Sequence, residues 1–284
     1  MTEPLSLVVL AAGMGRRFGA LKQVTPVGPT DEALVDHTIR DATEAGVDRV
    51  VAVVRPEIRA EVVAHLERRV AVPLVVVEQP GPTAPRTRPW GAAEAVVLAL
   101  AAVPGPAIVA NADDHYGADA VGALVGWMRS GASGPGRGAL VTWPLAATCS
   151  DQGVVTRAVC RVGADGALLG MVEHHDVALG PDGTATSADG PIDPGAPVSM
   201  NLWGLPADAG PALAGVVGAF RSAHAGDPDA ELPLPTAVDA ILGAGALAVT
   251  TLPAGTTWAG VTHPDDLAAV RAKMATLAPV PLTA

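Results

Sequence analysis

The 284-residue sequence has few cysteines and few lysines. Its cysteines are Cys149 and Cys160, and its lysines are Lys22 and Lys273. Two cysteines without a secretory signal do not suggest a disulfide-rich extracellular scaffold. We therefore expect a reducing, cytoplasmic environment and two ordinary thiols, with a single disulfide as the alternative. Any chemistry that needs a lysine has only two places to occur.

Positive charge is also scarce. The chain has 18 Lys and Arg residues against 29 Asp and Glu residues, which gives a formal net charge of −11. A negative field of this size disfavours broad binding to nucleic acid or to an anionic membrane surface. An anionic ligand would therefore have to be held by local groups, and no nucleic-acid or membrane partner is expected.

The sequence has no apolar run long enough to cross a membrane. Residues 95–110 form the most apolar window, but Pro104, Gly105 and Pro106 interrupt it. The window is also shorter than the ~18–20 apolar residues that a span requires. Hydrophobic residues make up 49% of the chain, which argues against extensive disorder and predicts a soluble protein with a large core.

Apolar runs and helical patterns alternate over the first 145 residues. This rhythm predicts a mostly parallel sheet with helices on both faces. The expected strands cover residues 5–12, 49–54, 73–79, 107–114 and 138–145, and the expected helices cover residues 31–46, 56–70, 91–102 and 117–131. Ligands of such sheets bind at the carboxyl ends of the strands, so the segments at the carboxyl ends of the first and fourth expected strands are candidate sites.

The rhythm changes after residue 145. Residues 154–162 and 166–175 read as an antiparallel pair around a Gly-Ala-Asp-Gly turn. Residues 176–197 are rich in Gly, Pro, Asp, Ser and Thr, and we expect a long exposed loop there, of the kind that can act as a lid. The remaining expected elements are strands at 198–205 and 247–252 and helices at about 206–222, 234–244 and 263–277. No repeat and no linker divides the chain, so one domain over residues 1–284 is expected.

A glycine-rich segment, LAAGMGRRFGALKQ, follows the first expected strand at residues 10–23. Its glycines are Gly13, Gly15 and Gly19, and its cations are Arg16, Arg17 and Lys22. Glycines let backbone N–H groups approach a ligand closely, and the cations suit phosphate oxygens. The spacing fits neither the dinucleotide fingerprint nor the Walker motif. The segment nevertheless predicts a polyphosphate site.

The segment NADD, residues 111–114, ends the fourth expected strand. Carboxylate oxygens are the ligands that Mg²⁺ prefers, and Mg²⁺ commonly bridges a carboxylate and substrate phosphates. Asp113 is the predicted metal ligand and Asp114 the alternate. A cap on the helix that begins near Gly117 is the alternative role for this pair.

The glycine-rich segment resembles the Leu-Ala-Ala-Gly-x-Gly-x-Arg…Lys motif of nucleotidyltransferases with the sugar-1-phosphate nucleotidylyltransferase fold. Further similar segments occur in order along nearly the whole chain: RPWGAAEAV at 88–96, NADDHYG at 111–117, TRAVC at 156–160, VSMNLWG at 198–204, ELPLP at 231–235 and WAGVTHPDDL at 258–267. The resemblance implies a Rossmann-like mixed sheet, mostly parallel and flanked by helices, with a small antiparallel part. It also implies a nucleotide-binding half at 1–145 and an acceptor-binding half at 146–284.

The resemblance further implies a Mg²⁺-dependent reaction. A phosphate oxygen of a phosphorylated acceptor attacks the α-phosphorus of a nucleoside triphosphate, pyrophosphate leaves, and a nucleotide-activated compound remains. Positioning and charge neutralisation dominate such chemistry. The acceptor would be a sugar-1-phosphate or another phosphorylated alcohol. The base, the pathway and the oligomeric state stay open.

The resemblance assigns roles to individual residues of the first half. The nucleoside would lie against Leu10, Ala11, Ala12 and Gly13, and the phosphates against Gly15, Arg16 and Arg17. Lys22 would stabilise charge at the α-phosphate and on the leaving pyrophosphate, and Asp113 would hold the metal beside Asn111. The base would meet Gln79, Trp90 and Gly91. Ala92 and Glu94 replace residues usual in the family, so base choice cannot be carried over.

In the second half the resemblance implies an acceptor site of Arg157, Glu173 and Asn201. Arg157 would bind the acceptor phosphate, and the Asn201 amide would bind its hydroxyls. Two departures stand out. Gly260 replaces a second metal aspartate of well-known relatives, for which Asp265 or Asp266 could substitute unless they cap the final helix. His174 replaces a second lysine.

Two other functions remain open on the sequence. A glycosyltransferase of related fold would use an acidic motif for a nucleotide-sugar metal and would not need the Arg17 and Lys22 grip. A non-catalytic nucleotide-binding regulator would bind without turnover, as Gly260 and His174 allow. Molybdopterin nucleotidyltransferases share the opening motif, but SMNLWG and WAGVTHPDDL fit them poorly. Release of pyrophosphate from a nucleoside triphosphate would distinguish a nucleotidyltransferase from the glycosyltransferase and from the regulator.

Overall fold

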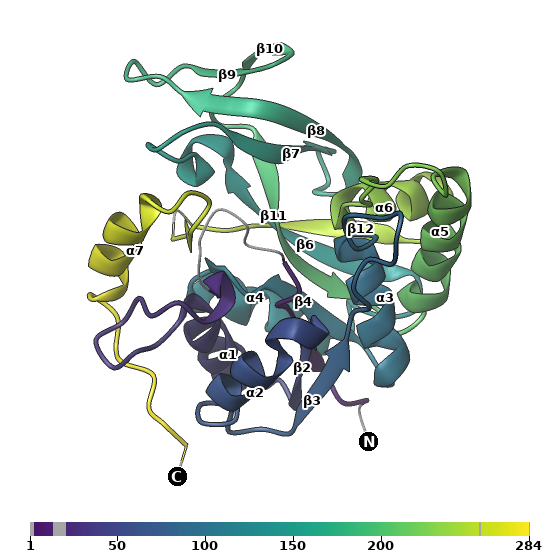
Figure 1. The fold of residues 1–284 in the computed structure, drawn as a ribbon. Helices are drawn as coiled ribbons and strands as arrows, with labels where there is room; N and C mark the ends of the chain where they lie inside the picture. The colour runs from purple at the N-terminus through teal and green to yellow at the C-terminus, as the bar shows by residue number, and fades with distance from the viewer. Residues whose placement is uncertain (1–2, 14–20, 256, 284) are drawn as a thin grey trace.

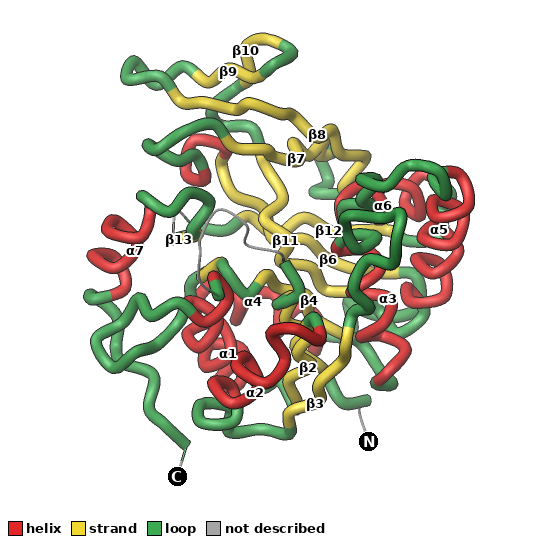
Figure 2. The backbone as a smooth tube through the Cα atoms, in the orientation of Figure 1, coloured by secondary structure: helices red, strands yellow, loops and turns green. Residues whose placement is uncertain are grey.

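The computed structural model describes residues 3–13, 21–255 and 257–283. A large mixed sheet runs through the molecule, with helices packed on both of its faces (Figure 1). The α/β fold class predicted from the alternating pattern is therefore confirmed. Figure 2 shows that a group of strands at one end extends beyond the helical layers.

Four parallel strands form one end of the sheet. They are β1 (Ser6–Leu10), β2 (Arg49–Val54), β3 (Leu74–Glu78) and β4 (Ala107–Asn111), in the order β3-β2-β1-β4. Their registers place the carboxyl ends together, with Leu10 of β1 opposite Asn111 of β4 and Val53 of β2. The segments after β1 and β4 therefore begin at the same edge of the sheet, as the sequence predicts.

A later strand is inserted beside β4. Strand β11 (Pro197–Leu205) pairs antiparallel with β4 and with β6 (Arg137–Pro144), and β12 (Ala248–Pro253) pairs parallel with β6. Because β11 is antiparallel to both neighbours, β6 runs in the same direction as β1 to β4. The five strands expected in the first 145 residues thus share one direction, but the fifth is separated from the fourth by a strand from the second half.

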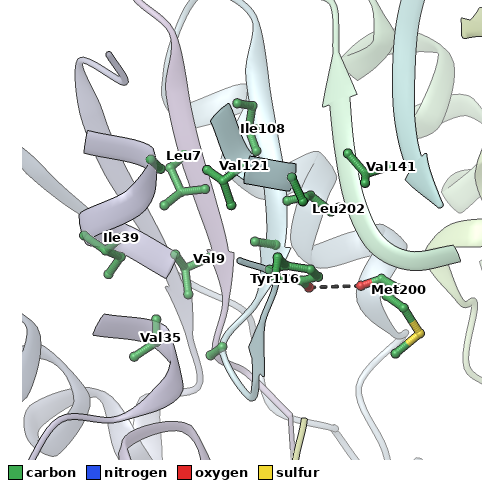
Figure 3. Close-up of a cluster of buried hydrophobic side chains, with 14 of the residues drawn as sticks. Leu7, Val9, Val35, Ile39, Ile108, Tyr116, Val121, Val141, Met200 and Leu202 are labelled. Carbon is green, nitrogen blue, oxygen red and sulfur yellow. Dashed lines mark hydrogen bonds between the residues drawn. The ribbon is translucent and has the colours of Figure 1, made fainter. Parts of the chain in front are cut away.

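Alternate residues of the central strands face two different cores. Leu7 and Val9 contact the helices on one side, whereas Val8 contacts those on the other. The first core, part of which is drawn in Figure 3, packs against α1 (Leu34–Ala45), α2 (Arg59–Leu66) and α4 (Ala118–Arg129). The second packs against α3 (Ala92–Ala102), α5 (Ala209–Ala223) and α6 (Leu234–Gly243). Burial on both faces explains why these strands read as uninterrupted apolar runs.

The second half adds an antiparallel extension. Strands β7 (Val155–Val162), β8 (Leu168–Leu179), β9 (Ala185–Ser187) and β10 (Gly190–Ile192) follow one another in this extension. The expectation of a long exposed loop over residues 176–197 is wrong, because β8 continues to Leu179 and β9 and β10 pair beside it. Turn-forming residues dominate the composition there, yet the free edge of β8 supplies hydrogen-bond partners for a short hairpin.

The remaining elements are short. Single helical turns lie at η1 (Lys22–Val24), η2 (Pro56–Ile58) and η3 (Leu145–Thr148), and a two-stranded pair joins β5 (Asp114–His115) to β13 (Ala259–Gly260). The final helix is α7 (Asp266–Met274). In the described parts of the chain, no helix combines the length and apolarity needed to cross a bilayer. Cys149 and Cys160 are free thiols.

Candidate active site

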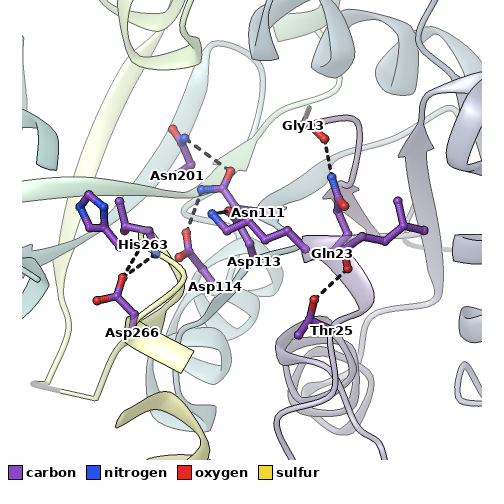
Figure 4. A network of polar contacts seen from close by, with 12 residues as sticks. Gly13, Gln23, Thr25, Asn111, Asp113, Asp114, Asn201, His263 and Asp266 are labelled. Carbon is purple, nitrogen blue, oxygen red and sulfur yellow. Dashed lines mark hydrogen bonds and ion pairs between the residues drawn. The ribbon is translucent and has the colours of Figure 1, made fainter. Parts of the chain in front are cut away.

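A cleft of about 280 Å³ opens at the carboxyl ends of the parallel strands, between β4, β7 and β11. Seven residues predicted from the sequence line it: Lys22, Asn111, Asp113, Asp114, Arg157, Glu173 and Asn201. Figure 4 shows several of these polar side chains converging from separate parts of the chain. The structure thus brings together residues that lie up to 179 positions apart, from Lys22 to Asn201.

Lys22 and Asp113 form an ion pair in this cleft. The distance from Lys22 Nζ to Asp113 Oδ2 is 2.5 Å. Lys22 is positioned by the turn η1, in which the hydroxyl of Thr25 donates to the Leu21 carbonyl and the buried Gln23 amide donates to the Gly13 carbonyl. The end of the glycine-rich segment therefore directs a lysine toward the end of β4.

Asp114 is buried beside this pair. Asn111 Nδ2 donates to Asp114 Oδ2 at 2.8 Å, and the hydroxyl of Thr38 on α1 donates to the Asp114 carbonyl at 3.1 Å. Burial, and then the neighbouring charge of Asp113, raise the pKa of Asp114 to about 7, against the lowering effects of Asn111 and Lys22. The two adjacent carboxylates thus differ strongly in environment.

A chain of amides connects Asp114 to the second half of the sheet. Asn201 Nδ2 donates to Asn111 Oδ1 at 3.5 Å, and the Trp203 indole N–H donates to Asn201 Oδ1 at 3.3 Å. Asn201 adopts a left-handed backbone (φ 62°) where β11 shifts its register between Ser199 and Trp203. Asparagine tolerates this conformation better than most residues. The bulge directs the Asn201 amide toward Asn111.

Tyr116, the chain's one tyrosine, anchors the same loop. Its hydroxyl accepts the Asn111 N–H and donates to the Met200 carbonyl, each at 2.9 Å. The ring is fully buried in the core of Figure 3. Sequence reasoning missed this residue, although its place two residues after Asp114 was a usable signal.

Arg157 lines the β7 side of the cleft, where it is buried and held mainly by backbone groups. Its Nε donates to the Thr148 hydroxyl, and its terminal nitrogens donate to the carbonyls of Thr148 and Thr156. The guanidinium carbon lies 5.6 Å from the centre of the Trp258 ring. Burial lowers its pKa from the usual range, whereas the carboxylate of Asp114 raises it. Glu173, across the strand pair from Ala158, is exposed at the rim.

The residues predicted to meet the base lie outside this cleft lining. Gln79 is buried and donates its amide to the carbonyl of Gly91 at 3.0 Å and to Glu94 at 3.1 Å. The indole of Trp90 lies between two arginine side chains. The guanidinium carbon of Arg86 is 3.4 Å from its ring centre, and that of Arg221 on α5 is 5.4 Å away. Trp90 therefore packs among arginine side chains.

The described part of the glycine-rich segment is anchored to the sheet. Leu10 ends β1, and Ala11 and Ala12 are buried. The Ala11 N–H donates to the carbonyl of Val53, and Arg55 donates to the Ala12 carbonyl at 2.8 Å. Gly15, Arg16 and Arg17, which were assigned to the phosphates, lie outside the described residues.

The departures from the family pattern have structural counterparts. Gly260 lies opposite Asp114 in the β5–β13 pair. Asp266 accepts the N–H groups of Thr262 and His263, so its carboxylate caps the turn before α7. The His174 ring lies 3.6 Å from the Asp189 carboxylate.

The donor set at the end of β4 suits a hard divalent cation. Among the described residues, no three His, Cys, Asp or Glu side chains are grouped for metal binding. The two carboxylates of Asp113 and Asp114 would therefore need substrate or water oxygens to complete a coordination sphere, as is usual for Mg²⁺.

Known proteins resemble this chain in sequence and in fold. Residues 7–133 match the family of MobA-like NTP transferase domains. The inositol-1-phosphate CTP transferase of T. maritima is a similar solved structure, with a TM-score of 0.63, 14% identity and 95% of each chain covered. A Bacillus anthracis protein assigned as a glucose-1-phosphate thymidylyltransferase, solved with sucrose, has a TM-score of 0.69 and 13% identity, with 97% of each chain covered. A search of curated proteins gives no match. The chain thus has the fold of these two solved structures, and its residues 7–133 match the MobA-like NTP transferase domain family.

Proposed function

We propose that this protein is a nucleotidylyltransferase that couples a nucleoside triphosphate to a sugar-1-phosphate or another phosphorylated alcohol and releases pyrophosphate. One observation carries the proposal: within the NTP transferase domain, Lys22 and Asp113 meet in a cleft at the carboxyl ends of β1 and β4. Transfer of a nucleotidyl group to an acceptor phosphate requires two kinds of group, a cation that binds phosphate oxygens and a carboxylate that binds a metal. The similar solved structures, named for transfer to inositol-1-phosphate and glucose-1-phosphate, support the acceptor class.

In the proposed reaction, a phosphate oxygen of the acceptor attacks the α-phosphorus, the bond from this phosphorus to the bridging oxygen breaks, and pyrophosphate leaves. Lys22 would stabilise the charge that develops on the α-phosphate and on the leaving group. Asp113, with Asp114 beside it, would hold Mg²⁺, which neutralises phosphate charge when bound. The protein supplies position and charge, and no covalent intermediate is required.

The second half would bind the acceptor. Arg157 keeps two of its five N–H donors outside the described hydrogen bonds, so it can receive the acceptor phosphate without leaving Thr148 and Thr156. Asn201 would contact acceptor hydroxyls while it supports Asn111, and Glu173 would contact them from the rim. Residues 146–284 would thus form the acceptor half of one domain, and residues 1–145 the nucleotide half.

The nucleotide would lie along the glycine-rich segment. Leu10 to Gly13 would contact the nucleoside, and Gly15, Arg16 and Arg17 would bind the β- and γ-phosphates. Gln79 and Gly91 would meet the base, and Trp90 would support them by packing. A cytoplasmic location is part of the proposal, since two free thiols suit a reducing compartment.

The test is a panel of five nucleoside triphosphates combined with phosphorylated sugars and polyols. Pyrophosphate release, coupled to pyrophosphatase, reports turnover. We expect Lys22→Ala and Asp113→Ala to lower the rate by about 10²–10³ or more while circular dichroism shows a folded protein. Lys273→Ala is the matched control, because the chain's other lysine bonds the Trp258 carbonyl and does not line the cleft. Full activity of either site variant would reject the proposed site, and nucleotide binding without pyrophosphate release would favour a regulator.

A further inference from the structure

The Lys22–Asp113 ion pair joins the two residues to which the proposed function gives different partners. Nζ and Oδ2 are 2.5 Å apart, and the side chains are 17% and 33% exposed. In catalysis Lys22 would face phosphate oxygens and Asp113 would face a divalent cation. In the structure each instead neutralises the other. The pair therefore occupies both binding positions at once.

The neighbouring carboxylate is less accessible than Asp113. Asp114 is buried, its Oδ2 accepts the Asn111 amide at 2.8 Å, and the Tyr116 hydroxyl lies 3.5 Å from the same oxygen. A divalent cation that approached Asp113 or Asp114 would also meet the ammonium of Lys22. Like charges repel strongly in a partly buried site, where water screens them less.

We propose that this ion pair blocks cation binding by the free protein, so that the divalent cation enters together with the triphosphate. The inference rests on the proposed function. A triphosphate carries oxygens that compete with Asp113 for Lys22, and the flexible lysine stem lets the ammonium move to them. Asp113 is released by the same movement, and its carboxylate becomes available to the cation that the triphosphate brings. One exchange of partners thus couples nucleotide binding to metal binding.

The test measures Mn²⁺ binding in the absence of nucleotide and acceptor. Electron paramagnetic resonance reports free Mn²⁺, so a titration gives the affinity without any turnover. Lys22→Met removes the ammonium and keeps the stem, and we expect it to bind Mn²⁺ about tenfold more tightly than the unmodified protein. Lys273→Met removes the same charge away from the cleft, and we expect it to leave the affinity unchanged.

A second variant identifies the ligand. Lys22→Met combined with Asp113→Asn should return Mn²⁺ affinity to the weak level of the unmodified protein. If Lys22→Met binds Mn²⁺ no more tightly than Lys273→Met, or if the gain persists without the Asp113 carboxylate, the inference is overturned. These results are distinct from failure of the proposed function, which is judged by pyrophosphate release. Tighter Mn²⁺ binding in a chain that releases no pyrophosphate would support the ion-pair block alone.

Discussion

Gly260 leaves room for the carboxylate of Asp114. The two residues face each other in the β5–β13 pair, and a Cβ at position 260 would lie 2.3 Å from Asp114 Oδ1 and 2.3 Å from the Trp258 ring. Both neighbours are buried, so neither can move without disturbing others. Where the resemblance places a second metal aspartate, this chain instead brings the side chain of Asp114 from the opposite strand.

Replacing Gly260 with alanine should therefore displace Asp114 or Trp258. We expect a loss of about tenfold or more in kcat/KM for pyrophosphate release, because sub-ångström to 1 Å shifts of site groups can cost as much as ~10²-fold. Gly122→Ala on α4 is the control, since a Cβ there meets nothing within 4 Å. A Gly260→Ala enzyme with full activity and unchanged stability would contradict this account of the glycine.

Asn201 offers a way to separate backbone strain from side-chain function. Its φ of 62° is costly for alanine but free for glycine. Asn201→Ala and Asn201→Gly both remove the amide that bonds Asn111, so we expect an equal loss of activity in the two variants. Urea unfolding should show that Asn201→Ala has a free energy of unfolding about 1 kcal/mol lower than that of Asn201→Gly. Activity that instead follows stability across the pair would show that the amide has no role of its own.

The sequence predicts the local elements well where burial on both faces makes a strand continuous. Strand β2 is predicted to the residue, because Val50–Val54 is a run of β-branched and small apolar side chains between Arg49 and Arg55. Sequence cannot place β11 between β4 and β6, since that choice depends on packing between residues about 90 positions apart. The short strands β9 and β10 also escape prediction, because they form only against the edge of β8.

The same contrast holds for the candidate site. The meeting of Lys22 and Asp113 follows from their positions after two parallel strands. The packing of Trp90 between arginines does not, because Arg221 comes from α5 and nothing near Trp90 in the sequence announces it. The close approach of Asp114 to Gly260 is likewise not predictable from the sequence, because a glycine does not indicate which side chain will pack against it.

Gly91, which precedes the first residue of α3, should not tolerate a larger side chain. Its φ is 102°, and a Cβ would lie 2.5 Å from the Leu232 carbonyl oxygen. That carbonyl accepts the Ala93 N–H at 3.3 Å, and the Leu232 N–H donates to the Trp90 carbonyl at 2.9 Å. We expect Gly91→Ala to lower the free energy of unfolding by roughly 2 kcal/mol or more, since strain and lost hydrogen bonds add.

The control for Gly91 is Gly218→Ala on α5. A Cβ at Gly218 meets nothing within 4 Å, and alanine is the better helix former, so this variant should gain up to about 1 kcal/mol. The free energy of unfolding of each variant is measured by urea denaturation, with circular dichroism as the signal. Equal stability of the two variants would mean that the contact with Leu232 is not needed.

His37 should make the fold sensitive to acid. Its ring is 1% exposed, and neither ring nitrogen has a hydrogen-bond partner among the described residues. The ring packs edge-on against His115, with centroids 5.7 Å apart. Burial, and then the charges of His115 and Arg40, lower the pKa of His37 from 6.5 to about 4, although Glu32 and Asp36 oppose the shift.

The direction of the pH effect follows from this shift. Between about pH 6.5 and about pH 4 the unfolded chain binds a proton at His37 that the folded protein does not bind, so stability falls as the pH falls through this window. The full loss is about 3 kcal/mol, and above pH 6.5 the residue contributes no pH dependence. We expect His37→Leu to lose about 2–3 kcal/mol less than the unmodified protein when urea unfolding at pH 7.5 is compared with pH 4.5. The carboxylates and the other histidines titrate in both the variant and the unmodified protein. If the two proteins lose the same free energy of unfolding between pH 7.5 and pH 4.5, His37 is already protonated, or hydrated, in the folded state.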